Sequence, residues 1–204
     1  MKKTGSIILS LLLALSLAAC GMASSAAPIH GTVTGLRYEN AALGIGCELP
    51  ESWSYASEEE LAALIGQTAE LFDEKQGTKL AELDIFYDMM ALGPDGMNSV
   101  NVVVQNLGLA GLTATEAQVA DASVEAGIQG QEIGGITTVS VERNTVTLGG
   151  VEHEGLRMVG EYQGIPVYTQ QIVFKSGTHA AAVTLATFLE DGTAELADYF
   201  YALK

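Results

Sequence analysis

The sequence predicts an α+β domain in which helices pack on a mainly antiparallel sheet. The chain has 204 residues, of which 48% are hydrophobic and 17% charged, and this is enough apolar material for one packed core. Between residues 137 and 187, four long strand-like segments are separated only by short turns, and such links force neighbouring strands to be antiparallel. Helical patterns that begin at capping boxes separate the earlier strands.

The first half of the domain is predicted as two strands, a helix and a β-hairpin. Residues 32–38 and 45–49 have strand character, and Pro50 ends the second strand. Ser57 and Glu60 form a capping box, so the acidic residues there are interpreted as the start of a helix and not as a metal site. This helix is expected to run to about Phe72, and the hairpin strands are expected at 83–91 and 99–106.

The second half is predicted as a helix, four strands and a closing helix. The helix begins at about Thr115, with Thr115 and Gln118 or Thr113 and Glu116 as its capping box, Ala117, Ala120 and Val124 on its inner face, and Gly127 or Gly130 at its end. The four strands are expected at 137–148, 152–162, 167–175 and 180–187, with a two-residue turn at Gly149-Gly150. A last helix follows Asp191, with Leu196, Tyr199, Phe200 and Leu203 on one face. The predicted order is ββα ββ α ββββ α, in one sheet and one domain.

The N-terminus has the features of a bacterial lipoprotein signal. Lys2 and Lys3 precede an apolar run at 7–19, which would reach only about 20 Å as a helix, too short for a hydrocarbon core of about 30 Å. Leu17-Ala18-Ala19-Cys20 resembles the lipobox, and this resemblance implies cleavage before Cys20 and a diacylglyceryl thioether on its sulfur. The alternative is an ordinary secretory signal that happens to contain a cysteine.

This interpretation divides the chain into a removed signal peptide at 1–19, a lipidated cysteine with a short tether at 20–31, and one globular domain at 32–204. Ten flexible residues have a reach of about 17 Å, so the domain is expected to stay close to the membrane surface. The expected location is the cell membrane, facing outside the cytoplasm.

The charge balance limits the kinds of partner. There are 25 Asp and Glu against 9 Lys and Arg, a net charge of −16, and removal of Lys2 and Lys3 leaves seven basic residues and a net charge of −18. Nucleic acids require clustered basic residues to replace their counterions, so no nucleic-acid partner is expected. Anionic lipid headgroups repel the domain for the same reason.

Few residues suggest covalent or metal chemistry. Cys47 is either a nucleophilic thiol or a small core residue, and the alternation of Ile45, Cys47 and Leu49 onto one face favours the core. Glu152-His153-Glu154 is the best metal fragment, but His153 points away from its two neighbours in a strand. No hydrolase or phosphate-loop motif is present, so neither catalytic residues, nor a metal, nor a cofactor is predicted.

The segment Leu43–Trp53 contains Leu-Pro-Glu-Ser-Trp after a small strand and resembles the opening of PsbP-like domains. Together with the element order, this resemblance covers residues 32–204. It implies an α/β/α sandwich that serves as a binding or accessory module, with no catalytic motif to carry over. The photosynthetic role of the plant members does not carry over, because their basic surfaces are absent here.

Two functions follow as hypotheses. The first is a membrane-tethered, non-enzymatic module that binds another envelope protein or a small solute. The second is an envelope hydrolase with a discontinuous active site. A hydrolase predicts a deep cleft with converging titratable groups, whereas a binding module predicts a flat or shallow face.

A candidate binding face lies on the hairpin 83–91/99–106. The expected register places Ile85, Tyr87 and Met89 opposite Val104, Val102 and Val100 on the buried side. The other side then carries Asp84, Phe86 and Asp88 opposite Gln105, Val103 and Asn101. Asp84 and Asp88 would be about 13 Å apart, too far for paired catalytic carboxylates, which suggests recognition of a cationic or polyhydroxyl partner. The alternative is an ordinary half-solvated or helix-covered sheet face.

Overall fold

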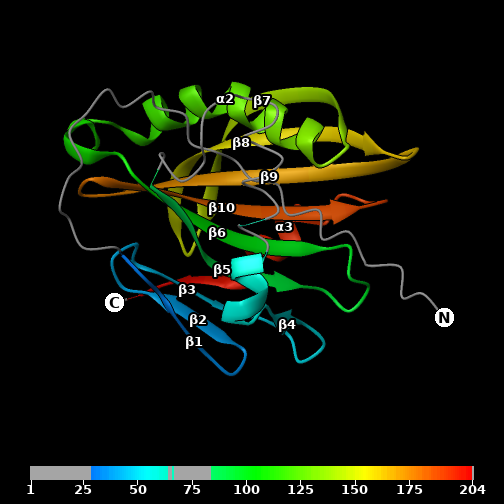
Figure 1. Ribbon diagram of the computed structural model, residues 1–204, viewed down its shortest axis with the longest axis horizontal. Coiled ribbons are helices and arrows are strands. Elements are labelled where there is room, and N and C mark those ends of the chain that lie inside the picture. The colour runs from blue at the N-terminus through cyan, green and yellow to red at the C-terminus, as the bar shows by residue number, and fades with distance from the viewer. Residues whose placement is uncertain (1–28, 64–65, 67–83, 204) are drawn as a thin grey trace.

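Two antiparallel sheets face each other in the computed structural model, which describes residues 29–63, 66 and 84–203 (Figure 1). The small sheet has the order β1-β2-β3-β11, with bounds Thr32–Thr34, Arg37–Asn40, Ile45–Glu48 and Phe200–Ala202. The large sheet has the order β4-β5-β6-β10-β9-β8-β7, with bounds Ser54–Tyr55, Ile85–Leu92, Ser99–Asn106, His179–Phe188, Ile165–Ser176, Val151–Tyr162 and Thr137–Leu148. The predicted α+β class with mainly antiparallel sheet is confirmed, but the strands form two sheets and not one.

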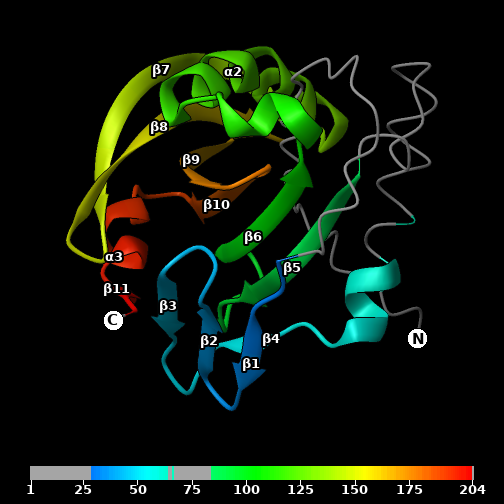
Figure 2. The same ribbon diagram turned by 90° about the vertical axis from the view of Figure 1, so that its left-hand side faces the viewer.

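The helices lie at the margins of this arrangement. Helix α2 (Glu116–Ile133) contacts β7, β8 and β9, and α3 (Thr193–Ala197) contacts β9 and β10. Figure 2 shows α2 and the small sheet on opposite sides of the large sheet. The large sheet therefore has an inner face, which meets the small sheet, and an outer face, which carries α2. None of the helices in the described part of the chain is long and apolar enough to cross a membrane.

The four-stranded meander β7–β10 agrees closely with the prediction. Gly149 and Gly150 both have positive φ, 59° and 86°, as a tight primed turn between antiparallel strands requires. Gln163 and Gly164 make the next turn with φ of 51° and 82°. These turn residues fix the strand ends, which is why the sequence located them within a few residues.

The strand predicted at 32–38 is wrong, because the chain reverses in its middle. Gly35 adopts a φ of 62° and turns β1 back onto β2, so that Thr32 pairs with Glu39 and Thr34 with Arg37. Only glycine takes this left-handed conformation without strain.

Helix α2 begins as predicted but ends later and faces a different way. Its capping box is formed by Thr115 and Gln118, with both reciprocal hydrogen bonds present. The helix continues through Gly127 and Gly130 to Ile133, because these glycines are buried against the sheet and act as small contact residues. Its buried side consists of Val119, Ala120, Ser123, Ala126, Gly127, Gly130 and Gln131, whereas Ala117 and Val124 are only half-buried.

The predicted C-terminal helix is also wrong beyond Ala197. The chain leaves α3 and forms β11, in which Phe200 pairs with Cys47 of β3. Phe200 remains buried at 6% exposure, while Tyr201 turns outward and donates from its hydroxyl to Glu39 at 3.0 Å. A short helical turn followed by a strand buries Leu196 and Phe200 as well as a longer helix would, so the apolar spacing did not distinguish the two.

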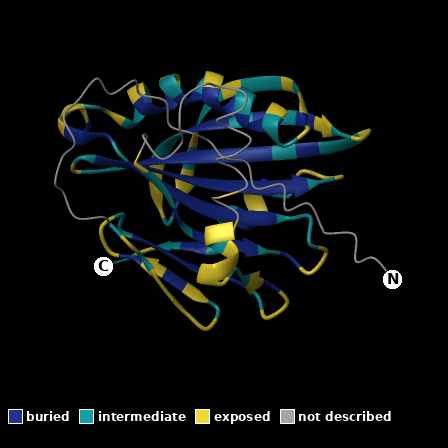
Figure 3. Ribbon diagram, in the orientation of Figure 1, coloured by how far each residue is buried: buried dark blue, intermediate teal, exposed yellow. Residues whose placement is uncertain are grey.

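The core lies between the two sheets and includes Cys47. Tyr38, Ile45, Cys47 and Leu49 meet Val100, Val102 and Val104 there, and Figure 3 shows how continuously the central strands are buried. Burial raises the pKa of the Cys47 thiol to about 12, so the thiolate is disfavoured at neutral pH. The core interpretation of Cys47 is confirmed.

We expect Phe200→Ala to lower the free energy of unfolding by about 3–5 kcal/mol, because it removes a buried ring from the contact between the sheets. Urea denaturation followed by circular dichroism measures this loss. A loss below about 0.5 kcal/mol, within the range of surface substitutions, would show that β11 contributes little to the packing of the sheets.

Candidate functional site

The predicted register of the β5–β6 hairpin is wrong, because β5 contains a bulge at Asp88. Ile85 pairs with Gln105 and Tyr87 with Val103, but after the bulge Met89 pairs with Val102. One extra residue shifts the alternation of side chains between the two faces. Phe86, Met89 and Ala91 therefore pack on the inner core, whereas Ile85, Tyr87 and Met90 pack on the outer face with Val103 and Leu61.

Asp88 is buried between the two sheets, with a side chain only 2% exposed. Its carboxylate accepts hydrogen bonds from the Tyr38 hydroxyl at 2.6 Å and the Asn40 amide at 2.8 Å, and from the backbone N–H of Gly31 at 2.9 Å. Nδ1 of His30 lies 3.3 Å from the same carboxylate. A buried carboxylate held by several donors joins the N-terminal strands to the large sheet, so Asp88 serves the fold.

The five residues predicted as a binding face do not share one face. Phe86 packs against the inner core, and its ring lies 4.4 Å from the ring of His30. Asp84 is exposed at the start of β5, where its φ is 49°. Asn101 and Gln105 are buried on the outer face, 1% and 2% exposed. The structure therefore keeps Asn101 and Gln105 together but separates them from Phe86 and Asp88.

A different polar cluster forms on the outer face, where three strands meet. Asn101 of β6 pairs with Thr184 of β10, and Thr184 pairs with Gln171 of β9. Thr169 lies two residues from Gln171 and so shares its face. We call Asn101, Thr169, Gln171 and Thr184 the polar row. All four are buried, with no more than 1% exposure.

The polar row contains polar atoms that the fold leaves unsatisfied. Oδ1 of Asn101, Oγ1 of Thr169 and Thr184, and both amide atoms of Gln171 have no hydrogen-bond partner among the residues that the structure describes. Each such atom costs about 1–3 kcal/mol relative to a satisfied one. Buried polar groups in folded proteins are almost always paired, so a cluster of exceptions requires an explanation.

The adjacent residue Gln170 shows how a glutamine is satisfied at the same depth. Its side chain faces the other way, is 5% exposed, and exchanges two hydrogen bonds with Asn144 at 2.8 and 3.1 Å. Its amide nitrogen also donates to the carbonyls of Leu156 and Gln171. The contrast between Gln170 and Gln171 shows that burial on this strand does not itself prevent hydrogen bonding.

Uncharged side chains lie next to the polar row on the sheet. Ala182 and Ala186 flank Thr184 on the same face of β10, and Met90 pairs with Asn101. The row itself offers amide donors and acceptors together with hydroxyl groups, and it contains no titratable group. Such a set can hydrogen-bond a neutral polar molecule, but it cannot transfer a proton near neutral pH.

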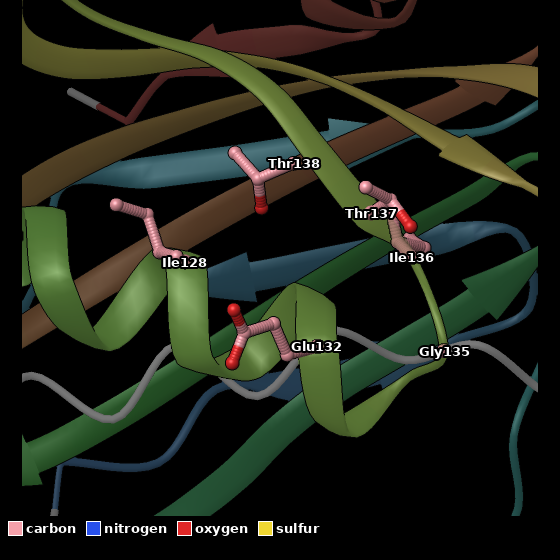
Figure 4. A pocket seen from close by; sticks show the side chains of 6 residues that line it. All are labelled: Ile128, Glu132, Gly135, Ile136, Thr137 and Thr138. Atoms are coloured by element: carbon pink, nitrogen blue, oxygen red, sulfur yellow. The ribbon is translucent and has the colours of Figure 1, made fainter.

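A separate cavity of about 460 Å³ lies where α2 ends and β7 begins, lined by Ile128, Glu132, Gly135, Ile136, Thr137 and Thr138 (Figure 4). Near it, the Thr138 hydroxyl donates to Oε1 of the buried Gln131 at 2.6 Å. Glu132 is the one titratable residue in this lining. These six described lining residues therefore supply no pair of acid and base of the kind that catalysis needs.

The metal fragment suggested by the sequence makes other contacts. Nδ1 of His153 lies 3.1 Å from the Glu116 carboxylate, and its ring lies 4.1 Å from that of Phe174. Glu154 forms an ion pair with Arg143, which also pairs with Asp121 of α2. Within the described ranges, no group of three or more His, Cys, Asp or Glu residues could hold a metal ion.

Two solved structures resemble this chain at low sequence identity. No protein-family model matches the sequence, and no curated protein matches it. A crystal structure from Bacteroides thetaiotaomicron is 8% identical with a TM-score of 0.43; the match covers 84% of this chain and 50% of that chain, so this chain spans half its length. LpqN of Mycobacterium tuberculosis, described as involved in cell envelope biogenesis, is 14% identical with a TM-score of 0.42, covering 87% of this chain and 90% of that one.

Asp84 and Asp88 provide a matched test of these roles. We expect Asp88→Asn to lower the free energy of unfolding by about 2–4 kcal/mol, because the buried donors of Tyr38, Asn40 and Gly31 lose their charged acceptor. Asp84→Asn should change it by less than about 0.5 kcal/mol, because Asp84 is exposed. Urea denaturation of both variants measures the difference, and equal stabilities would contradict the structural role of Asp88.

Proposed function

We propose that this chain is a lipoprotein of the cell envelope whose domain binds a small, uncharged, polar solute without reacting with it. The observation that carries this proposal is the polar row, a buried set of amide and hydroxyl groups with unsatisfied hydrogen-bonding atoms. A fold gains nothing from burying such atoms unpaired, whereas a bound solute would satisfy them.

The chemistry of the polar row favours a polyhydroxyl solute. Gln171 supplies a free donor and a free acceptor, and Asn101, Thr169 and Thr184 supply acceptors; none of these four has a charge. A sugar or polyol presents hydroxyl groups that both donate and accept, which matches this mixed set. A charged solute would instead bury an unpaired charge. The cationic partner suggested by the sequence therefore has less support than the polyhydroxyl one.

Membrane anchoring is the second part of the proposal. It rests on the lipobox-like Leu17-Ala18-Ala19-Cys20, on the basic residues before it and on the length of the apolar run. We propose that residues 1–19 are removed and that the lipid on Cys20 holds the domain outside the cytoplasm. Two acyl chains anchor far more firmly than one. The proposed PsbP-like kinship rests on Leu43–Trp53 and would imply the same class of binding or accessory module.

The hydrolase hypothesis has less support than solute binding. A hydrolase needs a nucleophile or an activated water beside a general base. The polar row contains no base, Cys47 is buried with a raised pKa, and the carboxylate of Asp88 is occupied by donors from the small sheet. An envelope protein as partner would need an exposed surface, whereas the polar row is buried.

Glutamines 170 and 171 provide a matched pair to test the binding site. We expect Gln171→Leu to leave stability unchanged or to raise it by about 1 kcal/mol, because an unsatisfied amide is replaced by an apolar side chain. Gln170→Leu should destabilise the domain by about 2–3 kcal/mol, because it leaves Asn144 unpaired. Urea denaturation measures both values.

Binding is measured on the same variants by thermal unfolding with a panel of neutral sugars and polyols, including trehalose, maltose and myo-inositol. A solute that raises the Tm of the wild type should fail to do so for Gln171→Leu, since a ligand stabilises only the state that it binds. Equal destabilisation by the two leucine substitutions, together with no response to any solute, would show that the polar row serves the fold.

The anchor is tested by replacing its acceptor atom. We expect Cys20→Ser to accumulate as an uncleaved precursor or a soluble form, whereas the wild type partitions into the detergent phase. Phase partitioning and mass spectrometry of the N-terminus measure this difference. A correctly cleaved Cys20→Ser protein that stays in the membrane would contradict lipid anchoring.

A further inference from the structure

Two of the most exposed leucines of the domain lie together on one turn. The short 3-10 helix η2 (Gly108–Leu112) follows β6, and its residues Leu109 and Leu112 are 61% and 62% exposed. Ala110 between them is also exposed, and Figure 3 shows exposed backbone in this turn between β6 and α2. Neighbouring exposed apolar residues on a soluble domain often mark a contact surface.

The backbone of η2 is held firmly against the sheet while its leucines point outward. Leu107 is buried, and its N–H donates to the carbonyl of Thr178 in the β9–β10 turn at 2.8 Å. Gly111 lies so close to this turn that an added Cβ would be 2.4 Å from the Thr178 oxygen. The exposure of Leu109 and Leu112 is therefore built into a well-packed turn.

The sequence around η2 is free of charge in an otherwise acidic protein. Residues 96–115 include no Asp, Glu, Lys, Arg or His, although the chain as a whole has a net charge of −16. Anionic headgroups repel acidic surfaces, so an uncharged apolar turn is the part that can approach a bilayer most easily. Lys175 lies close by and donates from Nζ to the carbonyls of Gly177 and His179, which brings a positive charge to the same end.

The chain also enters the domain at this end. The ring of His30 lies on Phe86, which pairs with Val104, only four residues before η2 begins at Gly108. Cys20 precedes Ile29 by nine residues, which span at most about 32 Å when fully extended. A lipid on Cys20 would therefore hold the η2 end of the domain close to the bilayer.

We propose that Leu109 and Leu112 insert into the interfacial layer of the bilayer and orient the domain with its η2 end toward the lipid. This inference rests on the proposed lipid anchor at Cys20. Acidic side chains also lie near this end: Asp84, whose carbonyl accepts from the N–H of Asn106, and Glu116, which begins α2 four residues after Leu112. The inserted surface is therefore limited to the turn itself.

Leu189 provides a matched control at the opposite end of the molecule. It is 63% exposed and follows Phe188, the last residue of β10, whereas the first residue of that strand, His179, pairs with Asn106 next to η2. The strand places Leu189 about 30 Å from the η2 end. An insertion specific to η2 should leave Leu189 in water.

The test uses the full lipidated chain, extracted from membranes and reconstituted into vesicles of phosphatidylcholine, with or without phosphatidylglycerol. Leu112→Cys and Leu189→Cys are each labelled with the environment-sensitive dye NBD. Labelling is selective, because the lipid occupies Cys20 and Cys47 is fully buried. We expect NBD emission at position 112 to rise at least about twofold and shift to the blue in vesicles compared with detergent-free buffer, with little change at position 189. Leu109→Asp should abolish the rise, and Leu189→Asp should not.

Vesicle flotation separates this inference from the anchor itself. A chain that floats but shows the same NBD response at positions 112 and 189 would overturn the proposed insertion while leaving the anchor intact. A chain that does not float would overturn both proposals. If the NBD emission at position 112 rises with protein density at constant lipid, the turn contacts a second copy of this chain. If the emission rises only after an envelope extract is added, the turn contacts another protein. Either result would overturn insertion into lipid.

Discussion

The buried carboxylate of Asp88 is the interaction on which the rest of this structure depends. It lies at the bulge of β5 and holds Tyr38, Asn40 and Gly31 against the large sheet. The bulge also changes which β5 side chains face inward, so that Phe86 and Met89 both reach the core despite their odd spacing. One charged side chain thus sets the contact of the two sheets, the register next to it and the position at which the chain enters the domain.

The sequence predicted the parts of the fold that local chemistry determines. Turns such as Gly149-Gly150 place the ends of β7–β10, and Thr115 with Gln118 places the start of α2. The bulge could not be predicted, because apart from Asp88 the residues of β5 are apolar on both faces, and an extra residue then leaves no sign in their alternation. The secondary structure of the last residues could not be predicted for a related reason. Leu196 and Phe200 can be buried equally well by one helix or by a helical turn followed by a strand.

The polar row was beyond sequence analysis because its members lie far apart in the chain. Asn101 meets Thr184 only through the pairing of β6 with β10, two strands that are not consecutive. A usable signal was present, however. Gln170 and Gln171 are adjacent in the middle of a largely apolar strand, so one glutamine had to lie on each face of the sheet. Asp84 and Asp88 were predicted as the site instead, because a sequence shows where charged residues occur but not that Asp88 is buried and bound by donors from the N-terminal strands.

The proposed site and the proposed orientation are compatible in space. The strands of the large sheet run from the η2 end to the end that carries Leu189, and Thr184 lies five residues along β10 from His179. At about 3.3 Å per residue, the polar row crosses the sheet about 17 Å from the η2 end. A domain anchored at that end would hold the row on the aqueous side of the headgroups, clear of the lipid. The two proposed functions therefore use different parts of the large sheet. The apolar turn at one end would contact the bilayer, and the unpaired polar atoms in the middle would bind the solute.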